Sequence, residues 1–222
     1  MKMLLTAAGV ANDAIKDALI ELLGKPIEES SALCIPTAGY GHPNSGPGER
    51  AWQFVAGKSR LHMTDLGWKS MGLMELTALP SIKPEQWVPL VKSTDALLVN
   101  GGDALYLVHW VRESGLADLF PELNDTVWVG LSAGSMAMAP KMGNDFIQWQ
   151  PPSGEDKGLG LVDFSIGPHW APDGGPGNTT ADLEAWAASF DGVKYAIDDE
   201  TAFKVDADGK VDIVGGRWRR FD

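Results

Sequence analysis

Short apolar runs alternate with segments of helical periodicity, and this alternation constrains the fold more than any other feature of the chain. Buried strands are predicted for residues 3–7, 32–36, 73–76, 96–100 and 127–130. Helices are predicted for residues 13–23, 49–62, 83–91, 104–114 and 135–138. Such alternation is typical of a parallel sheet covered by helices on both faces. We therefore expect an α/β fold, a three-layer sandwich with a mainly parallel central sheet.

The second half of the chain follows a different pattern. Residues 142–178 are rich in Gly, Pro, Asp and Trp, which predicts long loops and short strands of the kind that often carry binding residues. A helix is predicted at 180–189, followed by a closing β-meander with strands at 194–197, 202–205 and 211–214. No repeat or linker divides the sequence, so residues 1–222 are expected to form a single domain.

Charge and cysteine content limit the partners of the chain. It has 18 basic and 30 acidic residues and a formal charge of −12, so it repels phosphate backbones and anionic lipid. Nucleic acid and membrane surfaces are therefore not expected as partners. Cys34 is the single cysteine, which excludes an internal disulfide and fits a reducing cytoplasm. No residue cluster has metal-ligand spacing, and we expect a cytoplasmic protein with neither metal nor cofactor.

A Gly-x-Ser-x-Gly pentapeptide marks the candidate nucleophile. Ser132 lies in Gly130-Leu131-Ser132-Ala133-Gly134, between a predicted strand and a predicted helix. A nucleophilic serine must stand clear of the backbone at a tight strand-to-helix turn, and small neighbours allow that turn to close. The bare pattern also occurs in ordinary turns whose small residues only permit close packing. The strand–pattern–helix setting favours a catalytic Ser132.

A serine nucleophile needs a base, and histidine is the usual one. His62 and His109 fall in predicted helices, and His42 lies in the early loop, where it could contact a substrate. His169 is the only histidine that follows Ser132, and it opens a loop rich in Gly and Pro. We predict that His169 is the general base, the alternative being a solvent-exposed loop histidine.

Several segments together resemble the dipeptidase E and cyanophycinase family of serine peptidases. The similar segments are Gly130–Ser135, Val99–Leu105, Asn144-Asp145, Gly160–Trp170 and, as in cyanophycinase-like members, Ala196–Ala202. They occur in family order over roughly residues 1–215. The resemblance implies a fold like that of class I glutamine amidotransferases, with serine where those enzymes carry cysteine. It implies a single peptidase domain that hydrolyses short peptides through a Ser-His-Asp triad.

The same resemblance assigns further roles. It selects Asp145 as the acid that orients His169, although Glu155, Asp156 and Asp163 also lie between Ser132 and His169 and stay open as alternatives. The oxyanion hole is expected to consist of the backbone N–H groups of Gly102 and Ala133.

The substrate is harder to predict because the chain departs from the aspartyl dipeptidases. Residues 170–180 contain no Lys or Arg that could hold an acidic side chain. Trp149, Trp170 and Gln148 are instead expected near the site, which suggests an apolar or aromatic pocket, although the tryptophans could equally fill the core. We predict small peptides without a strict requirement for aspartate before the cleaved bond.

Three positively charged residues could still favour an acidic residue before the cleaved bond. Arg50, Lys58 and Arg60 follow the early loop and could bring a positive charge to the site.

The sequence does not determine the oligomeric state, and a homodimer is left open.

Two other functions remain as alternatives. An esterase of the α/β-hydrolase fold also runs serine, acid and histidine in chain order, but only 37 positions separate Ser132 from His169, which leaves little room for the elements such a hydrolase inserts. A non-catalytic small-molecule-binding protein of the same fold is the other alternative. The intact set of candidate residues argues against it.

Overall fold

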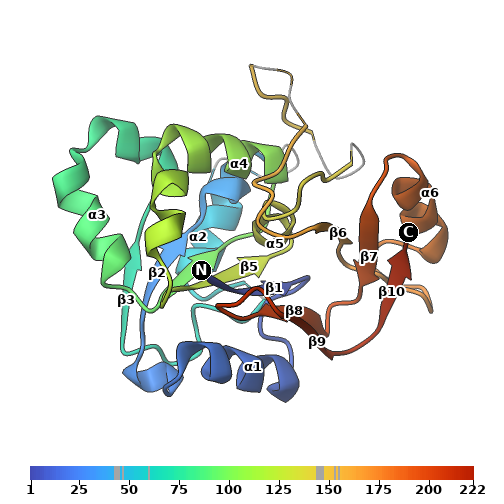
Figure 1. Cartoon of the computed structure of the whole chain (residues 1–222), viewed down its shortest axis with the longest axis horizontal. Coiled ribbons are helices and arrows are strands. Elements are labelled where there is room, and N and C mark those ends of the chain that lie inside the picture. The colour runs from blue at the N-terminus through green and yellow to red at the C-terminus, as the bar shows by residue number, and fades with distance from the viewer. Residues whose placement is uncertain (43–45, 47, 60, 144–147, 153, 155) are drawn as a thin grey trace.

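The computed structural model describes residues 1–42, 46, 48–59, 61–143, 148–152, 154 and 156–222. Within these residues a seven-stranded sheet forms the centre (Figure 1). Its strands lie in the order β3 (Ser70–Leu73), β2 (Ser31–Ile35), β4 (Ala96–Val99), β5 (Val127–Leu131), β1 (Lys2–Thr6), β8 (Thr201–Val205) and β9 (Val211–Gly215). All pairs from β3 to β1 are parallel, and β8 and β9 are antiparallel to their neighbours. The expected mainly parallel sheet is confirmed.

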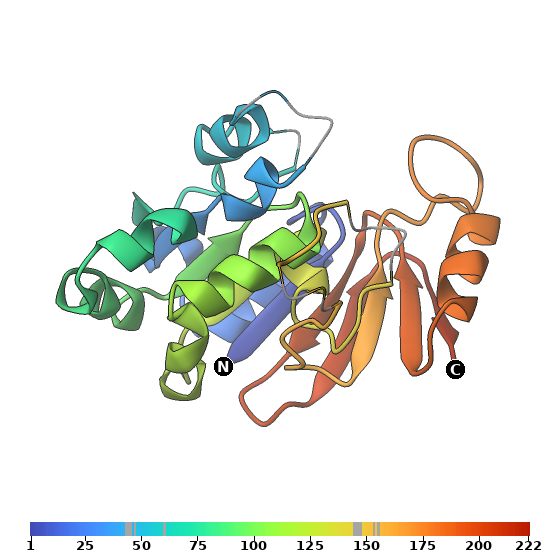
Figure 2. The same ribbon diagram turned by 90° about the horizontal axis from the view of Figure 1, so that it is seen from above.

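Helices cover both faces of this sheet (Figure 2). One face packs against α1 (Asp13–Leu23) and α2 (Glu49–Val55), and the other packs against α3 (Pro84–Lys92) and α4 (Ala104–Glu113). Successive residues of a strand point to opposite faces. In β4, Leu97 therefore joins the cluster beside α4 and Leu98 joins the cluster beside α1. The three-layer sandwich is confirmed.

Shorter elements complete the chain. They are the helices α5 (Ala133–Met136) and α6 (Thr180–Ala188), and the 3-10 helices η1 (Ile27–Glu29), η2 (Thr37–Tyr40), η3 (Leu76–Ser81) and η4 (Leu116–Glu122). No helix in the described ranges is both long enough and apolar enough to span a bilayer.

Residues at the ends of the elements explain where the predicted bounds agree with the structure and where they differ. Helix α1 has the predicted bounds because the Asn12 side chain accepts from the Ile15 N–H and Gly24 ends the helix with φ 71°. The helix predicted over 49–62 ends at Val55, and Gly57 turns the chain with φ 62°. The strand predicted at 73–76 is also misplaced. It lies at Ser70–Leu73, because Glu75 accepts from the Thr77 N–H and begins η3 instead.

The predicted closing meander is wrong, although its three strands exist. Strand β7 (Val193–Ile197) leaves the large sheet and pairs with β6 (Phe164–Gly167) and β10 (Trp218–Phe221) in a second, three-stranded sheet. Only β8 and β9 join the large sheet, where β8 pairs with β1 and covers its otherwise open edge. The change of sheet occurs at the turn between β7 and β8. That turn proves central to the candidate site.

The buried cysteine gives a test of the core. Cys34 in β2 is 1% exposed, and its burial raises the pKa of the thiol to about 11. Because the thiolate is the reactive form, we expect Cys34 to resist iodoacetamide at neutral pH in the folded protein and to react on unfolding in guanidinium. Mass spectrometry of the two samples measures this. Rapid alkylation of the native protein would contradict the placement of β2 inside the sheet.

Candidate active site

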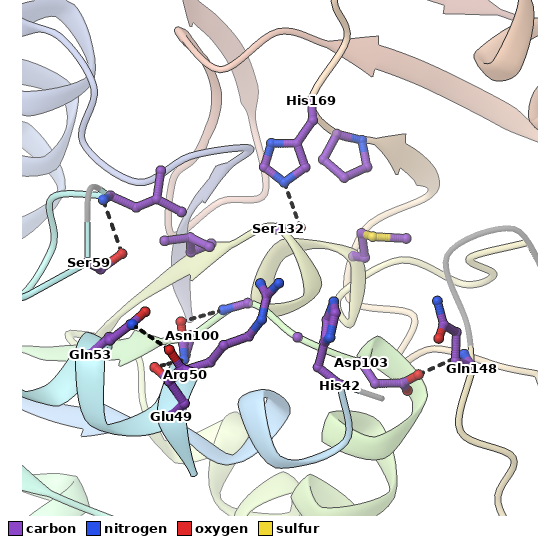
Figure 3. A pocket seen from close by; sticks show the side chains of 16 residues that line it. His42, Glu49, Arg50, Gln53, Ser59, Asn100, Asp103, Ser132, Gln148 and His169 are labelled. Atoms are coloured by element: carbon purple, nitrogen blue, oxygen red, sulfur yellow. Dashed lines mark hydrogen bonds between the residues drawn. The ribbon is translucent and has the colours of Figure 1, made fainter. Parts of the chain in front are cut away.

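The carboxyl ends of three strands meet at one cavity of about 680 Å³ (Figure 3). Gly101 and Gly102 follow β4, and Ser132 follows β5 of the large sheet. His169 follows β6 of the small sheet, and it too lines the cavity. Ligands bind beyond the carboxyl ends of strands in such sheets, so the topology itself brings these residues together.

Ser132 occupies a strained turn. Its backbone has φ 48° and ψ −107°, a conformation that residues other than glycine seldom adopt. The neighbouring glycines make the turn possible. A Cβ on Gly130 would lie 2.6 Å from the Gly134 carbonyl carbon, and a Cβ on Gly134 would lie 2.5 Å from the Val99 oxygen. The pentapeptide thus has the backbone shape of a nucleophile elbow and places Ser132 at the end of β5.

His169 connects this serine to a carboxylate. Its Nε2 lies 3.1 Å from Ser132 Oγ, and its Nδ1 lies 2.6 Å from Asp199 Oδ1 (Figure 3 shows the first contact). A carboxylate can only accept, so Nδ1 carries the proton and donates to Asp199. In the neutral imidazole, Nε2 then carries no proton and accepts from the serine hydroxyl. This tautomer is the one a general base requires.

The carboxylate that contacts His169 belongs to Asp199, in the acidic segment 196–202, and not to a residue expected from the sequence. Asp145 and Glu155 lie outside the described residues. Asp163 lines a different cavity, and Asp156 is exposed and is not among the residues that line the cavity of Ser132. The missed signal was topological. Strands β6 and β7 are parallel neighbours, which places the residues that follow them side by side.

Gly102 and Ala133, the two residues expected to form an oxyanion hole, lie in the turns that follow β4 and β5. Gly102 has φ 149°, and a Cβ on it would lie 2.0 Å from the Ala38 oxygen, so only glycine fits. The same turn passes close to the nucleophile, since a Cβ on Gly101 would lie 3.4 Å from Ser132 Cβ. In the described part of the chain, neither the Gly102 nor the Ala133 N–H donates to a protein acceptor. Both remain available for a substrate oxygen.

The three residues expected to bind substrate lie in different surroundings. Gln148 lines the cavity, and its N–H donates to Asp103 Oδ2 over 2.8 Å. Trp149 packs against the rings of Tyr106 and His109, with centroids 5.3 and 5.1 Å away.

Trp170 donates from its indole to Thr180 Oγ1 over 3.0 Å and packs beside α6. Neither this tryptophan nor Trp149 is among the described residues that line the cavity.

Polar side chains from the early part of the chain also line the cavity. They are Glu49, Arg50 and Gln53 of α2 together with His42. Burial and the Arg50 guanidinium lower the pKa of His42, so this imidazole stays neutral near pH 7. Of the three cations considered from the sequence, Arg50 lines the cavity, Lys58 is not among the described lining residues, and Arg60 lies outside the described residues.

No metal-binding group was found among the described residues, where three or more His, Cys, Asp or Glu side chains never gather as a ligand set. The chemistry proposed below needs none, because the serine, the imidazole and the backbone N–H groups supply the nucleophile, the base and the oxyanion donors.

Comparison with known proteins identifies the family. The model of peptidase family S51 matches residues 3–213. The chain belongs to this family. A peptidase E of Nostoc sp. is 38% identical over 85 residues, which cover 36% of this chain and 34% of the relative. A peptidase E of Shewanella putrefaciens is 32% identical over 135 residues, covering 57% and 56%. The matches thus span about a third to about half of the length of these curated relatives.

Two solved peptidase structures have a similar fold. A protein described as a peptidase E from Listeria monocytogenes EGD-e superposes with a TM-score of 0.60 at 16% identity, covering 99% of this chain and 97% of that one. A peptidase from an acI-B1 Actinobacterium gives a TM-score of 0.60 at 21% identity, covering 99% and 86%. The expected resemblance to the dipeptidase E family is confirmed.

Proposed function

We propose that this member of family S51 is a serine peptidase that hydrolyses short peptides, with Ser132, His169 and Asp199 as its triad. The carrying observation is the continuous hydrogen-bond chain from Asp199 Oδ1 through the imidazole to Ser132 Oγ, with contacts of 2.6 and 3.1 Å. The strained backbone of Ser132 supports the same role. The relatives named peptidase E support peptides as the substrate.

The proposed mechanism gives each step of the reaction to one of these residues. Ser132 Oγ attacks the peptide carbonyl while His169 Nε2 takes its proton. Gly102 and Ala133 donate their N–H groups to the oxygen on which negative charge develops. The imidazolium, held by Asp199, then protonates the leaving amine. Water repeats the sequence on the acyl-enzyme and releases the acid.

Covalent labelling tests this proposal without knowledge of the preferred peptide. A fluorophosphonate probe reacts with activated serines, and we expect it to modify the wild-type protein at a single residue, Ser132. Digestion and mass spectrometry locate the adduct. If the folded protein is not labelled and cleaves none of a set of dipeptides, isoaspartyl peptides and simple esters, the non-catalytic alternative is favoured.

Arg50 is the feature that most affects substrate choice. It supplies a positive charge in the cavity that residues 170–180 lack. Arg50 is exposed to solvent, and exposed ion pairs contribute only about 0–1 kcal/mol. We propose that an acidic residue before the cleaved bond is favoured modestly and is not required.

A kinetic panel of X-Leu dipeptides measures this preference. We expect kcat/KM for Asp-Leu to exceed that for Leu-Leu by about fivefold or less, which corresponds to about 1 kcal/mol. Arg50→Gln should remove the difference, and Lys58→Gln, outside the cavity lining, serves as the control. A preference of about a hundredfold, or one that survives Arg50→Gln, contradicts this account of the pocket.

A further inference from the structure

The side chain of the proposed triad acid, Asp199, has few contacts that could hold it in one orientation. Asp199 is 54% exposed, and His169 is its only hydrogen-bond partner among the described residues. An exposed aspartate ordinarily samples several rotamers, and misplacement by about 1 Å can cost about a hundredfold in rate. The backbone turn that carries Asp199 must therefore fix the orientation of its carboxylate.

The neighbouring carboxylate holds that turn in place. Asp198 is only 16% exposed, in contrast to Asp199. Its Oδ1 accepts from the Thr201 hydroxyl over 2.6 Å and from the Glu200 N–H over 3.1 Å. Its Oδ2 accepts from the Arg217 N–H over 2.8 Å. The Asp198 side chain thus bridges both sides of its own turn and a second turn beyond β9.

That second turn, residues 215–217, fits closely against the first. The Asp198 N–H donates to the Arg217 oxygen over 3.0 Å, and the Gly216 N–H donates to the Glu200 oxygen over 2.8 Å. A Cβ on Gly216 would lie 2.4 Å from Asp198 Oδ1. Glycine at 216 therefore leaves the space that the Asp198 carboxylate occupies.

The second turn also reaches the loop that carries the base. The Arg217 guanidinium lies 2.7 Å from Asp173 Oδ2, in the loop that follows His169, and 3.8 Å from Asp198 Oδ2. The turn and β10 belong to residues 214–222, which follow the region matched by the family model. In Figure 1 this segment runs from β9 to the small sheet, where β10 lies beside β7.

From these contacts we infer that Asp198 is a positioning residue that aims Asp199 at His169, and that residues 215–217 hold it there. Asp198 does not touch the reacting atoms. It acts by holding the backbone of the turn that carries Asp199. This inference rests on the proposed triad and adds to it a role for the chain beyond residue 213.

The test uses the rate of fluorophosphonate labelling. Asp198→Asn replaces one acceptor oxygen by a donor, and Gly216→Ala intrudes on the carboxylate while keeping it. We expect each change to slow labelling by about 10- to 100-fold. Arg219→Ala is the matched control, because Arg219 lies in β10 and pairs with Glu184 of α6, 2.6 Å away. It should label within about twofold of the wild type.

Double variants separate positioning from general destabilisation. If Asp198 acts through Asp199, neither Asp198→Asn nor Gly216→Ala slows labelling further in an Asp199→Asn background. The single variants should also shift half-maximal labelling to lower pH, since an imidazole that loses a nearby anion gives up its proton more easily. Circular dichroism confirms folding, and the two single variants serve as independent routes if one fails to fold.

The possible results distinguish the two proposals. A wild type that is not labelled at all refutes the proposed triad. A labelled wild type in which Asp199→Asn slows labelling but Asp198→Asn and Gly216→Ala do not refutes the positioning role alone. Equal slowing by these two variants with and without Asp199, at an unchanged pH midpoint, also refutes it.

Discussion

Replacing Ser132 with alanine is expected to lower kcat for dipeptide hydrolysis by about 10⁶-fold and to abolish fluorophosphonate labelling. The loss is large because the hydroxyl is the attacking group, and without it His169 has no nucleophile to activate. Residual hydrolysis, if measurable, comes from binding and the oxyanion hole alone. Steady-state kinetics on the best dipeptide of the panel measures the change.

Ser135→Ala is a suitable control for this substitution. Ser135 lies three residues away in α5, is fully buried, and donates to the Thr6 oxygen over 2.8 Å. Its loss removes one buried hydrogen bond, worth about 1 kcal/mol of stability, but no reacting group. We expect a lower Tm and nearly normal labelling. If Ser132→Ala retains wild-type labelling, another residue is the nucleophile and the triad is wrong.

Asp199→Asn is expected to have the second largest effect, a loss of about 10³-fold in kcat/KM. An asparagine amide can present its N–H₂ to His169 Nδ1, which then favours the wrong tautomer and leaves a proton on Nε2. KM should change little, because Asp199 stands behind the imidazole and away from the substrate. Kinetics at several pH values separate a lost base from a changed binding step.

The same experiment decides between Asp199 and the acid suggested by family resemblance. Asp145→Asn and Glu155→Gln should each retain activity within about threefold if Asp199 holds His169, since substitution of a carboxylate that does not orient the imidazole has a small effect. Loss of activity in Asp145→Asn with retention in Asp199→Asn reverses the assignment. Equal losses would show that both carboxylates contribute.

The parts of the site that depend on local sequence could be predicted. Ser132 stands in a pentapeptide whose neighbours must be small, and Gly102 lies in a turn that only glycine fits, so the residues themselves report the geometry. Helix α1 has the bounds predicted from its apolar spacing, and Asn12 and Gly24 cap its two ends. Such signals act within a few residues and survive without knowledge of the fold.

The parts that depend on how distant strands pair could not be predicted. The residues of β7, β8 and β9 read as three consecutive strands, and nothing local shows that β7 belongs to another sheet. With β7 assigned to a meander, Asp199 has no reason to lie near His169. The indole of Trp170 was likewise expected near the substrate, yet Thr180 and α6 hold it elsewhere.

The two sheets divide the proposed machinery between them. Ser132 and Gly102 end strands of the large sheet, whereas His169 and Asp199 follow neighbouring strands of the small one. Rotation of one sheet against the other would therefore change the Oγ–Nε2 separation, now 3.1 Å, while the imidazole and its carboxylate moved as one body. The contact between base and nucleophile therefore depends on how the two sheets are held against each other.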